Sequence, residues 1–119
     1  MTPDITAALE SDRTIDITTT GRKSGEPQRL EIWFHNVDGR IYITGTPGRR
    51  DWHANLLADP AFTFHLKESI QADIPAVAHP IVEPAAKRAV FEVLLDRLGY
   101  ADRIDTWVAD SPLVEVTFP

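Results

Sequence analysis

The segment from Gln28 to Val37 constrains the fold most strongly, because polar and apolar residues alternate along it. Such alternation is typical of a strand that buries one face and exposes the other. Asp38-Gly39 follows at once, and this pair is a strong signal for a two-residue hairpin turn. Residues 40–46 then return as the partner strand. The sequence therefore predicts an antiparallel hairpin whose apolar face carries Leu30, Ile32 and Phe34.

Apolar periodicity and turn residues place the other elements along the chain. Residues 13–20 are rich in isoleucine and threonine and are predicted as a strand. Pro84 suits a helix start, and Gly99 is a natural C-terminal cap for that helix. Pro75 should lie at a sheet edge or a bulge, because it has no N–H to donate. The remaining predictions are helices over 2–12 and 51–57 and strands over 62–66, 71–81 and 113–118.

The order of these elements is helix, three strands, short helix, two strands, helix and strand. Strands dominate and tight hairpins connect them, so the sheet is expected to be mostly antiparallel. We predict a mainly β (α+β) fold, in which a six-stranded sheet closes into a small barrel with two or three peripheral helices. At 119 residues the chain is expected to form one domain, residues 1–119.

Composition excludes several classes of protein. The chain has no cysteine, so disulfides, thiolate metal sites and cysteine nucleophiles are ruled out. Its net charge of −6 opposes nucleic-acid binding, which needs a broad basic surface. No apolar stretch approaches the roughly 20 residues that cross a bilayer. Residues 1–13 lack a basic region followed by an apolar core, so we do not expect them to be a secretory signal. We expect a cytoplasmic protein, monomeric or homodimeric, without stable membrane insertion.

Two loops concentrate cations in this acidic chain. The first loop, residues 18–25, reads TTTGRKSG, and the second loop, residues 44–51, reads TGTPGRRD just before a predicted helix. Glycines let backbone N–H groups turn toward an anion, and a helix N-terminus adds unpaired N–H groups and partial positive charge. The two loops together predict a site for a polyanionic small molecule. A hairpin turn with a solvated basic tip is the alternative for the first loop alone.

These motifs resemble those of the deazaflavin-dependent nitroreductase family. The resemblance rests on the first loop with Glu26-Pro27, on Asp38-Gly39 and on WHANLLADP at 52–60, and it covers about residues 15–66. Members are split β-barrels similar to the FMN-binding oxidoreductases, so a split barrel is implied here. The resemblance also implies an oxidoreductase that binds reduced deazaflavin (coenzyme F-420) and passes a hydride to a small conjugated acceptor, such as a quinone or a nitroaromatic. Such chemistry needs little acid–base help from the protein.

The resemblance also implies which residues form the site. Arg22, Lys23 and Ser24 would hold the phosphate and acidic tail of the cofactor. The backbone of the second loop would lie along the deazaflavin ring and its phosphate, while Trp52 and Asn55 would help to fix that loop. The implied cofactor-binding set is Arg22, Lys23, Ser24, Thr44, Gly45, Thr46, Gly48, Arg49, Arg50, Trp52 and Asn55.

The catalytic residues stay unassigned, with His35, His53 and Tyr100 as candidates for protonating the reduced product. Glu31 and Pro47 differ from residues common in the family, so a non-catalytic carrier of deazaflavin or another small molecule is one alternative. An FMN-binding reductase is another. The four histidines lack the short spacings of metal ligands, so no metal site is predicted. No Ser-His-Asp order or carboxylate pair supports hydrolysis.

Overall fold

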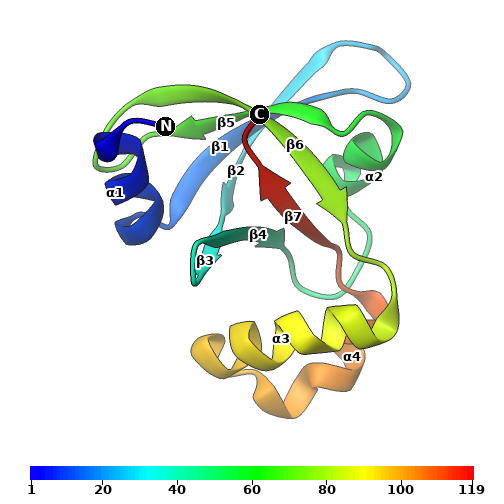
Figure 1. Ribbon diagram of the computed structural model, residues 1–119. Coiled ribbons are helices and arrows are strands. Elements are labelled where there is room, and N and C mark those ends of the chain that lie inside the picture. The colour runs from blue at the N-terminus through cyan, green and yellow to red at the C-terminus, as the bar shows by residue number, and fades with distance from the viewer.

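The computed structural model describes residues 1–119 and consists of one curled antiparallel sheet with helices on its outside (Figure 1). The sheet has seven strands in the order β2-β1-β5-β6-β7-β4-β3. The strands are β1 (Thr14–Thr20), β2 (Pro27–Trp33), β3 (His35–Val37), β4 (Arg40–Thr44), β5 (Ala61–Leu66), β6 (Ala72–Pro80) and β7 (Leu113–Thr117). The helices are α1 (Pro3–Ser11), α2 (Asp51–Ala58), α3 (Pro84–Leu98) and α4 (Ile104–Asp110), with a 3-10 turn η1 (Ala101–Arg103) before α4. The antiparallel split barrel is confirmed, but it has seven strands and four α-helices where we predicted six and two or three.

The seventh strand arises because the predicted strand over 28–37 is broken at Phe34. Its first part, β2, pairs with β1, whereas its second part, β3, pairs with β4 at the opposite edge of the sheet. Phe34 is buried at the break, where its N–H donates to the carbonyl of Arg13 at 2.9 Å and its ring packs edge-on against Phe64. The alternation of polar and apolar residues indicated which face of this segment is buried. Which strand pairs with each half of the segment depends on residues distant in the chain.

Two short-range predictions are confirmed in the sheet. Asp38 has a φ of 52° and Gly39 a φ of 89°, so the pair forms the tight turn between β3 and β4. Pro75 lies in β6 at a point where only β5 pairs with the strand, because β7 pairs with residues 77–80. One side of β6 is therefore an edge at Pro75, as a residue without an N–H requires.

Buried side chains form two hydrophobic clusters. The larger has 17 residues and fills the curled sheet, with Ile15, Ile17 and Phe64 fully buried. The smaller has six residues and joins α3 and α4 to β4 and β7. Helix α4, which we did not predict, depends on this cluster, because its Trp107 packs edge-on against Phe91 of α3 with ring centres 5.7 Å apart. Seven residues are too few for a helix to be stable in water by itself.

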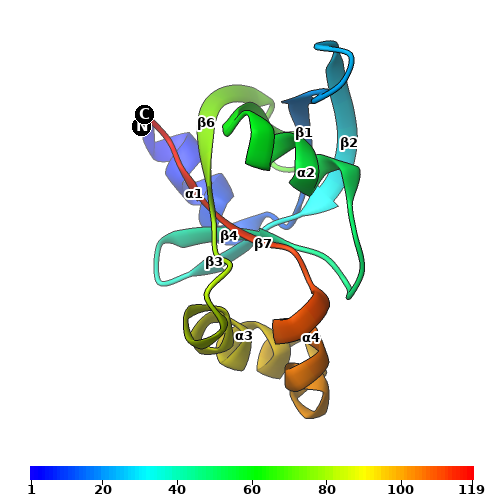
Figure 2. The ribbon, with the colours of Figure 1, turned by 90° about the vertical axis from the view of Figure 1, so that its right-hand side faces the viewer.

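Helix α2 lies away from the α3–α4 pair. Figure 2 shows α3 and α4 together below the sheet, while α2 crosses the upper part of the barrel. α2 contacts β1 and β6, and it begins directly after the second loop. The first loop follows β1 and the second loop precedes α2. Because α2 contacts β1, the N-terminus of α2 lies near both loops. None of the helices has the length and apolar character required to cross a membrane.

Candidate functional site

The first loop is a tight turn built around Gly21. Its N–H donates to the carbonyl of Glu26 at 2.9 Å, and the N–H of Gly25 donates back to the carbonyl of Gly21 at 2.8 Å. The Ser24 hydroxyl accepts from the N–H of Glu26 at 3.1 Å and folds over Gly21. A Cβ at Gly21 would lie only 2.6 Å from that hydroxyl oxygen and 3.2 Å from the Glu26 carbonyl oxygen. Glycine is therefore required here for space, and Ser24 shapes the turn.

Arg22 joins this loop to α2. Its backbone N–H and its Nη1 both donate to Oδ1 of Asn55, at 3.1 and 2.9 Å, and its Nη2 pairs with Asp51 at 3.3 Å. Asn55 is buried, and its Nδ2 donates to the hydroxyl of Thr19 at 3.2 Å. The resemblance implied that Asn55 helps to fix the second loop, but its side-chain hydrogen bonds reach β1 and the first loop instead.

The second loop is held partly by its own arginine. The Nη2 of Arg50 donates to the carbonyl and the hydroxyl of Thr46, at 2.9 and 2.7 Å, and its Nη1 donates to the carbonyl of Arg49 at 3.0 Å. Gly48 has a φ of 130°, in the region that favours glycine. The nearest neighbour of a Cβ at Gly45 would be the Arg50 guanidinium, at an ordinary contact distance of 3.5 Å. Gly45 therefore leaves room beside the loop.

The start and the middle of the second loop are attached to the end of α4 and the residues that follow it. The Thr44 hydroxyl donates to the carbonyl of Pro112 at 2.5 Å, and the N–H of Gly48 donates to the carbonyl of Asp110 at 3.0 Å. Thr44 is buried, so its hydroxyl is committed to this structural bond. The loop thus takes its position from a segment more than sixty residues further along the chain.

Two adjoining clefts open where the loops meet α2. One has a volume of about 450 Å³ and lies between the first loop, β2 and α2. The other, of about 710 Å³, lies between Arg22, the two arginines of the second loop and α2. Arg22 and Asp51 line both clefts. The predicted residues that line at least one cleft are Arg22, Lys23, Ser24, Arg49, Arg50, Trp52 and Asn55, whereas Thr44, Gly45, Thr46 and Gly48 line neither.

Positive charge at these clefts is only partly neutralised. Arg22 is the one cation of the two loops that has an acidic partner, and that partner, Asp51, is 91% exposed in its side chain. Lys23 and Arg49 make no ion pair. Helix α2 also starts without a side-chain cap, so its first N–H groups add to the local positive potential. The site is therefore suited to a small molecule that carries several negative charges.

His53 is the one proton-donor candidate beside these clefts. His53 lines the larger cleft, and neither His35 nor Tyr100 lines either cleft. Burial, and then the charge of Lys87, lower the pKa of His53, so its imidazole is neutral at pH 7. Trp52 is buried in the barrel core and packs edge-on against His53, with its indole reaching the smaller cleft. Neither residue adds a formal charge to the site.

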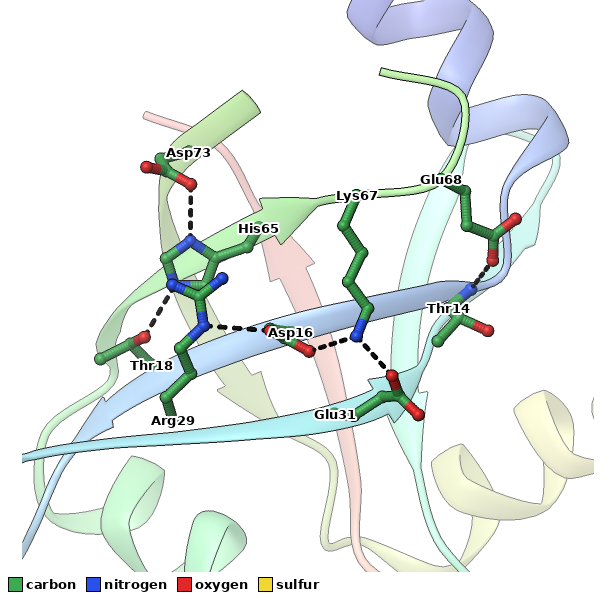
Figure 3. Close-up of polar contacts among 9 residues, drawn as sticks. All are labelled: Thr14, Asp16, Thr18, Arg29, Glu31, His65, Lys67, Glu68 and Asp73. Atoms are coloured by element: carbon green, nitrogen blue, oxygen red, sulfur yellow. Dashed lines mark hydrogen bonds and ion pairs between the residues drawn. The ribbon is translucent and has the colours of Figure 1, made fainter. Parts of the chain in front are cut away.

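The other notable polar cluster lies on the outer face of β1, β2, β5 and β6 (Figure 3). The Nε2 of His65 contacts the Thr18 hydroxyl and its Nδ1 contacts Asp73, both at 2.7 Å. Thr18, His65 and Asp73 thus follow one another in the order of the nucleophile, base and acid of a hydrolase triad. Neither Thr18 nor His65 lines either of the two clefts at the loops, and neither lines a third cleft, which lies beside Asp73. The geometry thus provides no substrate position next to the hydroxyl, and hydrolysis gains no support.

Beside this triad, an ion-pair network crosses the same face. Asp16 pairs with Arg29 at 3.0 Å and with Lys67 at 2.7 Å, and Lys67 also pairs with Glu31. The Lys67 hydrogen bond is the main reason why the pKa of Asp16 is lowered. Glu31, one of the two departures from the family pattern, is therefore used on the outside of the sheet and lines neither loop cleft.

Several cleft residues were not predicted from the sequence. Thr19, Gln28, Arg29, Leu30 and Asp51 line the smaller cleft beside the motif residues. The strand prediction placed Gln28 and Leu30 on β2, but only the pairing of β2 with β1 carries them to the first loop. Asp51 belonged to the second motif, and its acidic side chain gave no sign that it would pair with Arg22 across the site.

The split barrel and the two basic loops that meet at the start of α2 form a site suited to an anionic cofactor. The sequence profile of F420H(2)-dependent quinone reductase matches residues 3–114, so the chain belongs to that family. Its cofactor is the deazaflavin F420. The unpaired Lys23 and Arg49 and the uncapped start of α2 fit this acidic ligand.

Similar solved structures share the fold. A conserved hypothetical protein from Mycobacterium tuberculosis is 23% identical over 99% of this chain and 81% of its own, with a TM-score of 0.74. An F420 reductase is 21% identical over 95% of this chain and 91% of its own, with a TM-score of 0.67. An F420-H2-dependent reductase is 16% identical over 89% and 95%, with a TM-score of 0.65. At these identities the likeness supports the split barrel, and the family assignment rests on the profile match.

Proposed function

We propose that this protein transfers a hydride from reduced F420 to a small conjugated acceptor of the quinone or nitroaromatic type. The observation that carries the proposal is the meeting of two basic glycine loops at the start of α2, in a chain of this family. When bound, reduced F420 supplies the hydride. Reduction of a quinone to a hydroquinone takes one hydride and one proton, and bulk water is the source of that proton. The protein acts as a monomer or a homodimer.

The chain's own part in the reaction is binding and orientation. Lys23 and Arg49 attract the phosphate and acidic tail through charge, because neither has an acidic partner in the protein. Arg22 is held rigidly by Asn55 and presents its guanidinium at both clefts. Gly45 gives the backbone of the second loop close access to a flat ring. These contacts orient the reactants, and orientation is a large part of catalysis in hydride transfer.

A titration with F420 followed by a turnover assay tests this function. We expect binding at micromolar concentration, and loss of the absorbance of reduced F420 when a quinone or a nitroaromatic is added. Binding without oxidation across a broad acceptor panel would favour the carrier alternative instead. The absence of binding at high micromolar concentration would exclude both.

Salt dependence tests the assignment of the acidic tail to the two loops. Exposed charges are screened beyond about 8 Å at physiological ionic strength. The affinity for intact F420 should therefore fall severalfold from low to high salt, while a tail-less deazaflavin binds weakly at both. If the tail-less analogue binds as tightly as F420, the cations of the loops do not contact the ligand.

A further inference from the structure

The segment between α4 and β7 uses three consecutive carbonyl oxygens to hold other parts of the molecule. Those of Asp110 and Pro112 accept from the second loop, through the Gly48 N–H at 3.0 Å and the Thr44 hydroxyl at 2.5 Å. The carbonyl between them, that of Ser111, accepts from the Nζ of Lys87 at 2.7 Å. Lys87 belongs to α3, so a third element is attached at the same point.

Lys87 is unusual because it is the only charged side chain buried in the protein, at 8% exposure. A buried ammonium group costs free energy unless it is hydrogen-bonded or paired. Its hydrogen bond goes to the Ser111 carbonyl, and Ser111 is itself only 3% exposed. Burial lowers the pKa of the Lys87 ammonium and the charge of Asp110 acts against this, while the charge of Lys87 helps to lower the pKa of His53. The ammonium is therefore bonded to a backbone segment that is itself buried.

A charge-assisted bond at Ser111 restricts the rotation of the two peptide units on either side of it. Those units carry the carbonyls that hold Gly48, in the middle of the second loop, and Thr44, at its start. Inside the loop, Arg50 provides a separate contact to Thr46. Loss of the Lys87 bond would therefore loosen the loop at Thr44 and Gly48, while the contact between Arg50 and Thr46 stays in place.

We propose that Lys87 is a positioning residue for the second loop, acting through the carbonyl oxygens of Asp110, Ser111 and Pro112. The effect on loop order follows from these contacts alone. The consequence for F420 affinity rests in addition on the proposed function. Lys87 itself lines neither cleft, so it acts through the loop and not by touching the ligand.

The test compares Lys87→Met with Arg88→Met in the full chain. Methionine keeps most of the side-chain volume and removes the ammonium. Arg88 is the next residue of α3 and pairs with the exposed Asp105, so its substitution controls for the loss of a helical cation. Amide hydrogen exchange by NMR reports the Gly48 N–H directly, with the amides of β5 as the measure of global stability.

In Lys87→Met we expect Gly48 exchange to rise at least tenfold beyond any change in β5, and F420 affinity to fall severalfold. Arg88→Met should change neither quantity by more than about twofold. If Lys87→Met does not fold, Lys87→Gln, which keeps a neutral donor, is measured in its place with the same expected direction. Gly48 exchange that rises no more than that of β5 would overturn the inference. Faster Gly48 exchange in a protein that never binds F420 would confirm the loop link and refute the proposed function.

Discussion

Arg22 and Lys23 are neighbours in the sequence, yet the structure gives them different tasks. Arg22 makes three side-chain or backbone contacts to α2 and satisfies the carbonyl oxygen of the buried Asn55 side chain. Lys23 makes no ion pair and lines the smaller cleft. At the scale of single residues, one cation is largely part of the framework and the other is available to a ligand.

Separate substitutions should distinguish the two roles. Lys23→Ala is expected to weaken F420 binding roughly tenfold, the effect of one charge-assisted contact, without changing the melting temperature. Arg22→Ala should also weaken binding and should lower the free energy of unfolding by about 1–2 kcal/mol, because the buried Asn55 oxygen loses one of its two Arg22 donors. Fluorescence titration and thermal denaturation measure the two quantities. Unchanged affinity in Lys23→Ala would make Lys23 a solvated bystander.

At the scale of elements, the loops are shaped by backbone space as much as by charge. Gly21 and Gly45 both lack a positive φ, so neither position strains an alanine through its backbone angle. They differ in their surroundings: the Cβ of an alanine would lie 2.6 Å from the Ser24 oxygen at Gly21, but its nearest neighbour at Gly45 would be the Arg50 Nε, 3.5 Å away. The first loop is therefore closed around its glycine, and the second is open beside its own.

This difference predicts opposite results for two matched substitutions. Gly21→Ala should lower the free energy of unfolding by about 1–3 kcal/mol, because the turn must shift to accept the methyl group. Gly45→Ala should leave it within about 0.5 kcal/mol. Chemical denaturation of both variants provides the measurement. Equal stability of the two would contradict the packing of Ser24 over Gly21.

At the scale of the whole molecule, burial of one histidine links stability to pH. His35 lies at the start of β3, and burial, followed by the charges of Arg13 and Arg97, lowers its pKa to about 4. The unfolded chain has the ordinary value near 6.5, so between these pH values the unfolded state binds more protons than the folded state. Stability must therefore fall as the pH decreases through this window.

The magnitude can be measured against a variant that cannot titrate. The stability of the wild type relative to His35→Gln should drop by about 2–3 kcal/mol from pH 7 to pH 4, allowing for partial solvent access. Urea denaturation at a series of pH values gives this difference. A difference that stays constant with pH would show that His35 keeps an ordinary pKa in the folded protein.

The sequence by itself determined the features that depend on neighbours along the chain. The Asp38-Gly39 turn, the helix from Pro84 to Gly99 and the two basic loops follow from local backbone preferences and composition. These preferences act over a few residues, so they can be recognised without the fold.

Only the tertiary structure decided which distant groups meet. The strand breaks into β2 and β3 where Phe34 is buried against Phe64, and α4 is stabilised by the packing of Trp107 against Phe91. The same holds for the site, where the Thr44 and Ser24 hydroxyls are used by the framework and a lysine of α3 reaches the segment that holds the second loop. Each of these contacts joins residues far apart in the chain. They form only when the barrel closes and buries the side chains together, so local sequence preferences do not reveal them.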